Sequence, residues 1–184
     1  RILEDGETGA KATLPQGLML TISYDMFTMA DEDDRTLPDL PLLLEKHPVP
    51  VVLPGRIHLP GSAWVLKAEV SARGAMRSDE ALNTVRDWEA YLDAGVVGPF
   101  ARLRSRHRGD RFRPLGMGGR DKRLNEFMIN EKIPASWRDH IPLLVNEKGH
   151  IVWVCGWRPD DRARVTDSTQ HVVWLRFERE VTGN

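Results

Sequence analysis

The chain contains a single cysteine, Cys155, so no disulfide can form within its 184 residues. A lone cysteine is typical of proteins kept in a reducing compartment, and the cytoplasm is therefore the expected location. Long apolar runs are also missing: none approaches the ~18 consecutive residues that a membrane-spanning helix requires. The first ten residues lack the apolar core of a signal peptide. We therefore expect no membrane as a partner.

An excess of charge of one sign is missing as well, since 26 Lys and Arg residues nearly balance 27 Asp and Glu residues. The near-neutral total gives no reason by itself to expect nucleic acid as a partner. The distribution of charge is uneven, however. Residues 100–123 carry nine basic residues against two acidic ones, whereas residues 25–39 carry six acidic residues and one arginine. Two oppositely charged segments therefore lie within a nearly neutral chain.

The chain also lacks recognisable catalytic and metal-binding motifs. Its six histidines and Cys155 show no spacing typical of metal ligands, so we expect no metal site. No serine stands in a nucleophile-elbow context. The glycines of PLGMGGRDK (114–122) match neither the Walker A pattern nor G-x-G-x-x-G, and they form either a flexible turn or a loop for one phosphate. The sequence therefore predicts no catalytic residue in this chain.

Hydrophobic periodicity predicts many short strands and few helices. Alternating apolar residues predict strands over residues 14–24, 64–70, 101–108, 141–145, 150–154 and 170–178. Helical spacing predicts helices over residues 78–92 and 121–131, although the Tyr91 end of the first could equally be extended. The second helix would begin on an Asp121 cap and bury three side chains, those of Leu124, Phe127 and Met128. These elements predict a β-rich α+β fold with a boundary near residues 95–100.

Residues 102–108 place an arginine at every second position. Alternate side chains of a strand share one face, which predicts a row formed by Arg102, Arg104, Arg106 and Arg108. A row of like charges favours a polyanion, because each neutralised phosphate also releases condensed counterions. The planar guanidinium fork grips phosphate oxygens through two donors. The alternative is a solvated face, or one that pairs with the acidic residues 25–39.

Three stretches of the second half form a long and specific pattern. They are RHRGDRFRPLGMGG (106–119), IPASWRDHIPLL (133–144) and IVWVCG (151–156), with the predicted helix through Leu124 between the first two. The pattern resembles the C-terminal domain of bacterial tRNA(Ile)-lysidine synthetases. The likeness is clear over residues 91–178 and loose over residues 1–90. The first residue is Arg1 rather than methionine, which suggests a piece of a longer protein.

The resemblance implies a C-terminal β-sandwich of unusual topology with one or two short helices over residues 99–184. A smaller strand-rich substrate-binding or connecting domain would precede it over residues 1–98. Enzymes of this family use ATP with magnesium to attach lysine to the wobble cytidine of the CAU anticodon of tRNA(Ile), a carbon–nitrogen ligation. That chemistry belongs to an N-terminal domain with an S-G-G-x-D-S loop, and no SGG occurs here. We expect an enzyme at full length, and here an inactive fragment that binds no cofactor.

By the same resemblance, this fragment positions tRNA(Ile), by its acceptor stem. Phosphates dominate the accessible contacts of A-form RNA, because its deep major groove is closed to side chains. The predicted RNA-binding residues are Arg102, Arg104, Arg106, Arg108, Arg111, Arg113, Arg120, Lys122, Arg123 and Arg138. The alternative function is a non-catalytic protein-interaction or dimerisation module, which predicts little RNA affinity and an exposed apolar patch. A homodimer is the one further partner that the sequence leaves open.

Overall fold

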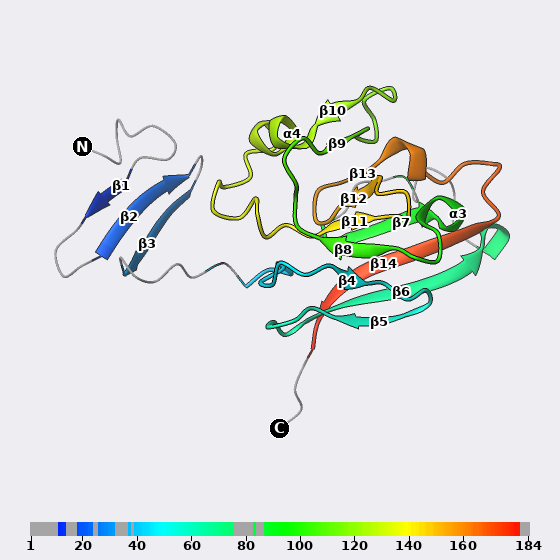
Figure 1. Cartoon of the computed structure of the whole chain (residues 1–184), viewed down its shortest axis with the longest axis horizontal. Coiled ribbons are helices and arrows are strands. Elements are labelled where there is room, and N and C mark those ends of the chain that lie inside the picture. The colour runs from blue at the N-terminus through cyan, green and yellow to red at the C-terminus, as the bar shows by residue number, and fades with distance from the viewer. Residues whose placement is uncertain are drawn as a thin grey trace.

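The computed structural model describes residues 11–13, 18–23, 26–31, 37, 39–75, 83 and 87–180 (Figure 1). Its first three strands, β1 (Lys11–Thr13), β2 (Leu18–Ser23) and β3 (Met26–Asp31), form an antiparallel sheet of their own. β2 confirms the strand predicted over residues 14–24. Most of the acidic run, residues 32–34, lies outside the described residues.

A four-stranded antiparallel sheet forms one layer of the main body. Its order is β5 (Gly55–His58), β6 (Trp64–Ala72), β14 (His171–Arg179) and β7 (Glu89–Asp93). β14 fits the strand predicted over 170–178, and its alternation sends Val173, Leu175 and Phe177 into the core. A strand with one buried face requires apolar side chains at every second position. The last strand of the chain, β14, therefore lies between β6 and β7, which come much earlier in the sequence.

A five-stranded antiparallel sheet forms the second layer, above the first in Figure 1. Its order is β13 (Arg158–Pro159), β12 (Ile151–Val154), β11 (Leu143–Val145), β8 (Arg102–Arg104) and β4 (Val49–Pro50). Every residue of β11 and β12 is buried, because both faces of this sheet are covered. The inner face meets the four-stranded sheet through apolar side chains that include Leu66, Leu92, Leu103, Leu144 and Trp153. The β-rich α+β class and the predicted sandwich are confirmed.

A small outer layer covers the other face of the five-stranded sheet. It contains β9 (Arg111–Phe112), β10 (Lys122–Arg123) and α4 (Leu124–Asn130). The predicted buried face of the helix is confirmed, since Leu124, Phe127 and Met128 are at most 1% exposed. The helix start was predicted wrongly: α4 is preceded by Arg123 without a side-chain cap. Asp121, the predicted cap, instead binds Arg111 of β9.

At the described end of the segment 78–92 the extended alternative holds and the helix does not, because this end is strand β7. Ala90 and Leu92 are buried while their neighbours are partly exposed, the alternation of a strand. The apolar positions of this segment fit both periods, and pairing with β14 decides the outcome. A one-turn helix, α3 (Ala94–Val97), follows β7 and is capped by Asp93, which accepts hydrogen bonds from two backbone N–H groups.

In each of the two main sheets, strands from before the predicted division at residues 98 and 99 pair with strands from after it. β14 pairs with β6 and β7 from before the division. β8, which lies after the division, pairs with β4, which lies before it. Within the described part of the chain, no helix is long and apolar enough to cross a membrane.

Candidate nucleic-acid interface

The basic segment leaves the five-stranded sheet after β8 and builds the outer layer. β9 and β10 pair so that Arg111 lies opposite Arg123. Phe112 between the exposed residues is fully buried and meets Phe127 of α4 edge-on, with ring centroids 4.9 Å apart. Because successive side chains of an extended chain point to opposite faces, the buried Phe112 turns Arg111 and Arg113 toward solvent. The aromatic contact thus holds a basic surface, which we call the basic layer (residues 105–123).

The four arginines that were predicted to share one strand face do not do so, because β8 ends at Arg104. The Arg104 side chain is only 8% exposed and donates to both carboxylate oxygens of Asp110, at 2.7 and 2.9 Å. Arg106 is bound as well: it donates to Asp139 and to Asn125, each at 2.7 Å. Both arginines are therefore engaged in ion pairs within the protein, a buried one for Arg104 and a more exposed one for Arg106.

Two further predicted residues are also engaged within the protein. Arg111 binds Asp121, and the Nε of Arg138 donates to the carbonyl oxygen of Ile133 at 2.9 Å. The hydrogen bond from Arg111, with the nearby charge of Arg113, holds the pKa of Asp121 below its usual range. The other predicted residues form no salt bridge with any residue that the structure describes; they are Arg102, Arg108, Arg113, Arg120, Lys122 and Arg123.

Asp110 closes the loop over residues 105–109 at the start of the basic layer. Besides Arg104, the backbone N–H of His107 donates to it at 2.7 Å. Burial raises the pKa of Asp110, but the hydrogen bonds from Arg104 and His107 and the charge of Arg104 outweigh it. The net result is a pKa below the ordinary value of 3.8. Asp110 therefore stays ionised and bound to Arg104 through the neutral range.

Asp110→Asn is expected to destabilise the protein at neutral pH and to matter less in acid. The folded-state pKa of Asp110 lies below the unfolded value, so the carboxylate stabilises the fold above about pH 3.8. That stabilisation is lost as the pH falls through the lowered folded pKa. Urea unfolding of parent and variant between pH 7 and pH 3 measures the difference. Asp167→Asn, at an exposed site, is the charge-matched control; a pH-independent gap for Asp110→Asn would contradict the assignment.

Asp160 is a fully buried acid that sequence reasoning missed. It accepts from the backbone N–H of Arg113 at 2.7 Å and from the backbone N–H of Arg162 at 2.9 Å. The guanidinium of Arg162 binds both of its oxygens at 2.8 Å. Asp160 thereby fixes the end of β9 to the 3-10 turn η3 (Asp161–Ala163). An acid before a short helix is a typical N-cap signal, but nothing local indicates a partner 47 residues away.

The glycine loop between β9 and β10 owes its composition to backbone conformation. Gly116 and Gly118 adopt φ angles of 83° and 63°, and an added Cβ at either would meet nothing within 4 Å. Side chains would fit in space, but this left-handed region favours glycine. The loop projects between Arg113 and Arg120, both exposed. An exposed arginine therefore flanks this loop on each side in the sequence.

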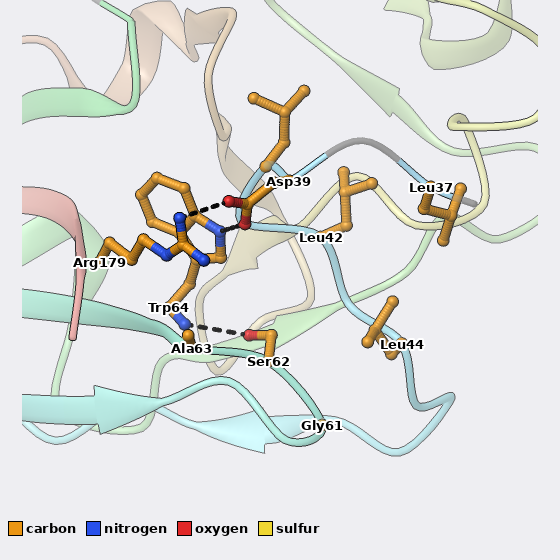
Figure 2. A pocket seen from close by; sticks show the side chains of 10 residues that line it. Leu37, Asp39, Leu42, Leu44, Gly61, Ser62, Ala63, Trp64 and Arg179 are labelled. Atoms are coloured by element: carbon orange, nitrogen blue, oxygen red, sulfur yellow. Dashed lines mark hydrogen bonds and ion pairs between the residues drawn. The ribbon is translucent and has the colours of Figure 1, made fainter. Parts of the chain in front are cut away.

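A separate hollow of about 480 Å³ lies next to β6 (Figure 2). Leucines form much of its lining, together with Trp64, Asp39 and Arg179. The polar groups satisfy one another: Asp39 accepts from Trp64 Nε1 at 3.1 Å and from Arg179 at 2.7 Å. Figure 2 shows these two contacts meeting at one carboxylate. The hollow holds no nucleophile–base pair among its described residues, and its charges are already paired.

Metal-ligating side chains do not converge in the described part of the chain. No three His, Cys, Asp or Glu side chains there lie close enough to hold an ion. Cys155 is fully buried, and burial raises its pKa well above the ordinary value. The thiol is therefore neutral. The feature that distinguishes the surface is its basic layer. Contacts of buried residues fix its backbone, and several of its arginines are exposed.

Comparisons with known proteins match this chain to a protein family. Residues 101–175 match the family model of the TilS substrate C-terminal domain. The chain is 33% identical over 175 residues to tRNA(Ile)-lysidine synthase of Dehalococcoides mccartyi (strain CBDB1), covering 94% of this chain and 34% of that protein. The corresponding protein of Symbiobacterium thermophilum is 33% identical over 172 residues, with 93% and 34% covered.

A solved structure gives the same result. The crystal structure of a TILS C-terminal domain aligns with a TM-score of 0.59 and 26% identity, over 74% of this chain and 98% of that chain. The chain spans about a third of the length of the curated relatives it matches.

Proposed function

Since this chain belongs to the tRNA(Ile)-lysidine synthase family through its C-terminal domain, we propose that it binds tRNA(Ile) and positions it for catalysis elsewhere. The full-length protein is proposed to be an ATP-dependent ligase that attaches lysine to the wobble cytidine of the CAU anticodon. ATP, magnesium and lysine would be used by a domain outside these residues. The present chain supplies binding and orientation.

The observation that carries the proposal is the group of cations left over after the ion pairs of the basic layer are formed. Arg113, Arg120 and Arg123 are exposed and form no salt bridge with any described residue. Asp160 holds the backbone at Arg113, so these charges are presented from a fixed surface. Guanidinium groups on a fixed surface suit a phosphate backbone, because little conformational entropy is lost when they bind it.

A paired stem, such as the acceptor stem, is the proposed RNA element. Its phosphates are the accessible groups, since the deep major groove of A-form RNA is closed to side chains. The proposed phosphate contacts are Arg102, Arg108, Arg113, Arg120, Lys122 and Arg123. Arg104, Arg106, Arg111 and Arg138 are proposed to act indirectly, by holding the surface that carries the other six.

The salt dependence of tRNA binding tests this proposal. The logarithm of the binding constant should fall linearly with the logarithm of salt concentration. Replacing Arg113 and Arg123 by Gln should reduce the slope by roughly 2, about one for each lost phosphate contact. Filter binding or fluorescence anisotropy with a tRNA(Ile) transcript measures it.

The matched control is Arg56→Gln with Arg176→Gln. Both residues are exposed on the four-stranded sheet, Arg176 lies 3.5 Å from Glu178, and the pair removes the same formal charge. Equal slopes for the two double variants would mean that RNA senses only net charge. A chain that self-associates and does not bind tRNA would favour the dimerisation module instead.

A further inference from the structure

Phe100 and Val52 stand out as exposed apolar side chains on a well-packed body. They are 70% and 66% exposed, more than any other large apolar side chain of the described residues. Val52 lies two residues after β4 and Phe100 two residues before β8, and these strands pair at the edge of the five-stranded sheet (Figure 1). Single exposed apolar residues are normal on a protein surface, but neighbouring ones mark a contact site.

The strand register places the two residues together. β4 and β8 pair as Val49 with Leu103, and the backbone N–H of Val51 donates to Ala101 at 2.9 Å. Val52 directly follows Val51 and Phe100 directly precedes Ala101, so both residues lie next to the last hydrogen bond that joins the two segments. We call this surface the edge patch (Val52 and Phe100).

A cation lies close in sequence to the edge patch. Ala101 and Leu103 are buried, whereas Phe100 is exposed and Arg102, two residues further on, is partly exposed. Arg102 is partly exposed and forms no salt bridge with a described residue. The Cα atoms of Phe100 and Arg104 lie no more than roughly 14 Å apart along the chain. The edge patch therefore adjoins the start of the basic layer.

The edge itself is unsuited to adding a strand from another protein. β4 contains only Val49 and Pro50, and Pro54 follows shortly after it. Proline offers no backbone N–H for a further ladder, and natural proteins use short, proline-containing edges to prevent such pairing. A partner of the edge patch would have to contact the side chains. An aromatic ring beside a free guanidinium is the combination that stacks on nucleic-acid bases.

We propose that Phe100, flanked by Arg102, stacks on an unpaired base of an RNA whose phosphates lie along the basic layer. This inference rests on the proposed function and adds a contact of a different kind. The base leaves its neighbours and places its ring face on Phe100, while Arg102 binds the adjoining phosphate. Stacking is nearly independent of salt, whereas the phosphate contacts are not. The two contributions can therefore be measured separately.

The test is Phe100→Ala in this chain, with a tRNA(Ile) transcript and a blunt-ended RNA duplex as probes. The variant should bind the transcript roughly 5- to 150-fold more weakly, the range typical of one lost base–aromatic stack. Its salt slope should equal that of the parent. Affinity for the duplex, in which every base is paired, should not change. Phe100→Trp should retain the parent affinity for the transcript.

Phe100→Leu separates stacking from simple apolar contact, because leucine keeps apolar surface without a flat ring. It should weaken transcript binding as Phe100→Ala does. Leu44→Ala, at a residue that is 45% exposed in the hollow of Figure 2, is the control and should have no effect. Parent affinity in Phe100→Ala or Phe100→Leu would overturn the inference and assign the patch to a protein partner. The salt-dependent binding of the parent, and hence the proposed function, would still stand in that case.

Discussion

Residues 99–184 alone are expected to remain unfolded, whereas residues 37–184 should fold. The shorter fragment keeps β14 but removes both of its neighbours. All nine residues of β14 pair with β6, and five of them also pair with β7. The buried side chains of Val173, Leu175 and Phe177 would lose Leu66 and Leu92 as partners in the same core. A central strand exposed on both edges has no independent stability.

Far-ultraviolet circular dichroism and proton–nitrogen NMR spectra of both fragments measure this difference. Residues 37–184 are the matched control, because they contain every strand of the four- and five-stranded sheets. A dispersed NMR spectrum from residues 99–184 would show that the sandwich is complete without β6 and β7. It would then support the predicted boundary at residue 98.

Arg104→Gln is expected to cost about 3–5 kcal/mol of unfolding free energy, the usual result of breaking a buried ion pair. The side chains of Arg104 and Asp110 are 8% and 13% exposed. Without the guanidinium, the Asp110 carboxylate stays largely buried and loses its two shortest charged contacts. The loop over residues 105–109, which Asp110 closes, should loosen as well. Urea unfolding at neutral pH measures the loss.

Arg102→Gln is the control within the same strand. Its side chain is partly exposed and forms no salt bridge with a described residue, so the cost should stay within about 0.5 kcal/mol. Adding Asp110→Asn to Arg104→Gln should restore part of the stability, because no uncompensated charge then remains. Similar midpoints for Arg104→Gln and Arg102→Gln would show that the pair contributes little.

Part of the fold followed from local patterns. The strands at residues 64–70, 141–145, 150–154 and 170–178 were predicted because alternation or short apolar runs are encoded in adjacent residues. The buried face of α4 followed from the helical spacing of three apolar residues. The helix predicted over 78–92 failed at β7 because its apolar positions fit two periods. There the partner strand, which is distant in sequence, made the choice.

The arginines of residues 102–108 show what the sequence could not predict about the candidate site. The pattern of arginines predicted charge and phosphate chemistry. It could not predict which guanidiniums are free. Arg106 binds Asp139, which is 33 residues away, and Arg104 binds Asp110 only because β8 ends and the chain turns back. An alternating sequence is equally consistent with an exposed row and with a set of ion pairs.

The sequence by itself determined the absence of disulfides, the β-rich class, the membership of the family and the concentration of positive charge in residues 100–123. Each of these depends on composition or on residues near one another along the chain. The tertiary structure alone decided that Asp110, Asp139 and Asp121 neutralise some of the arginines and that Asp160 fixes Arg113. It also decided that Phe100 is exposed. Ion pairing and burial depend on which distant segments meet, and that is settled only when the sheets pack.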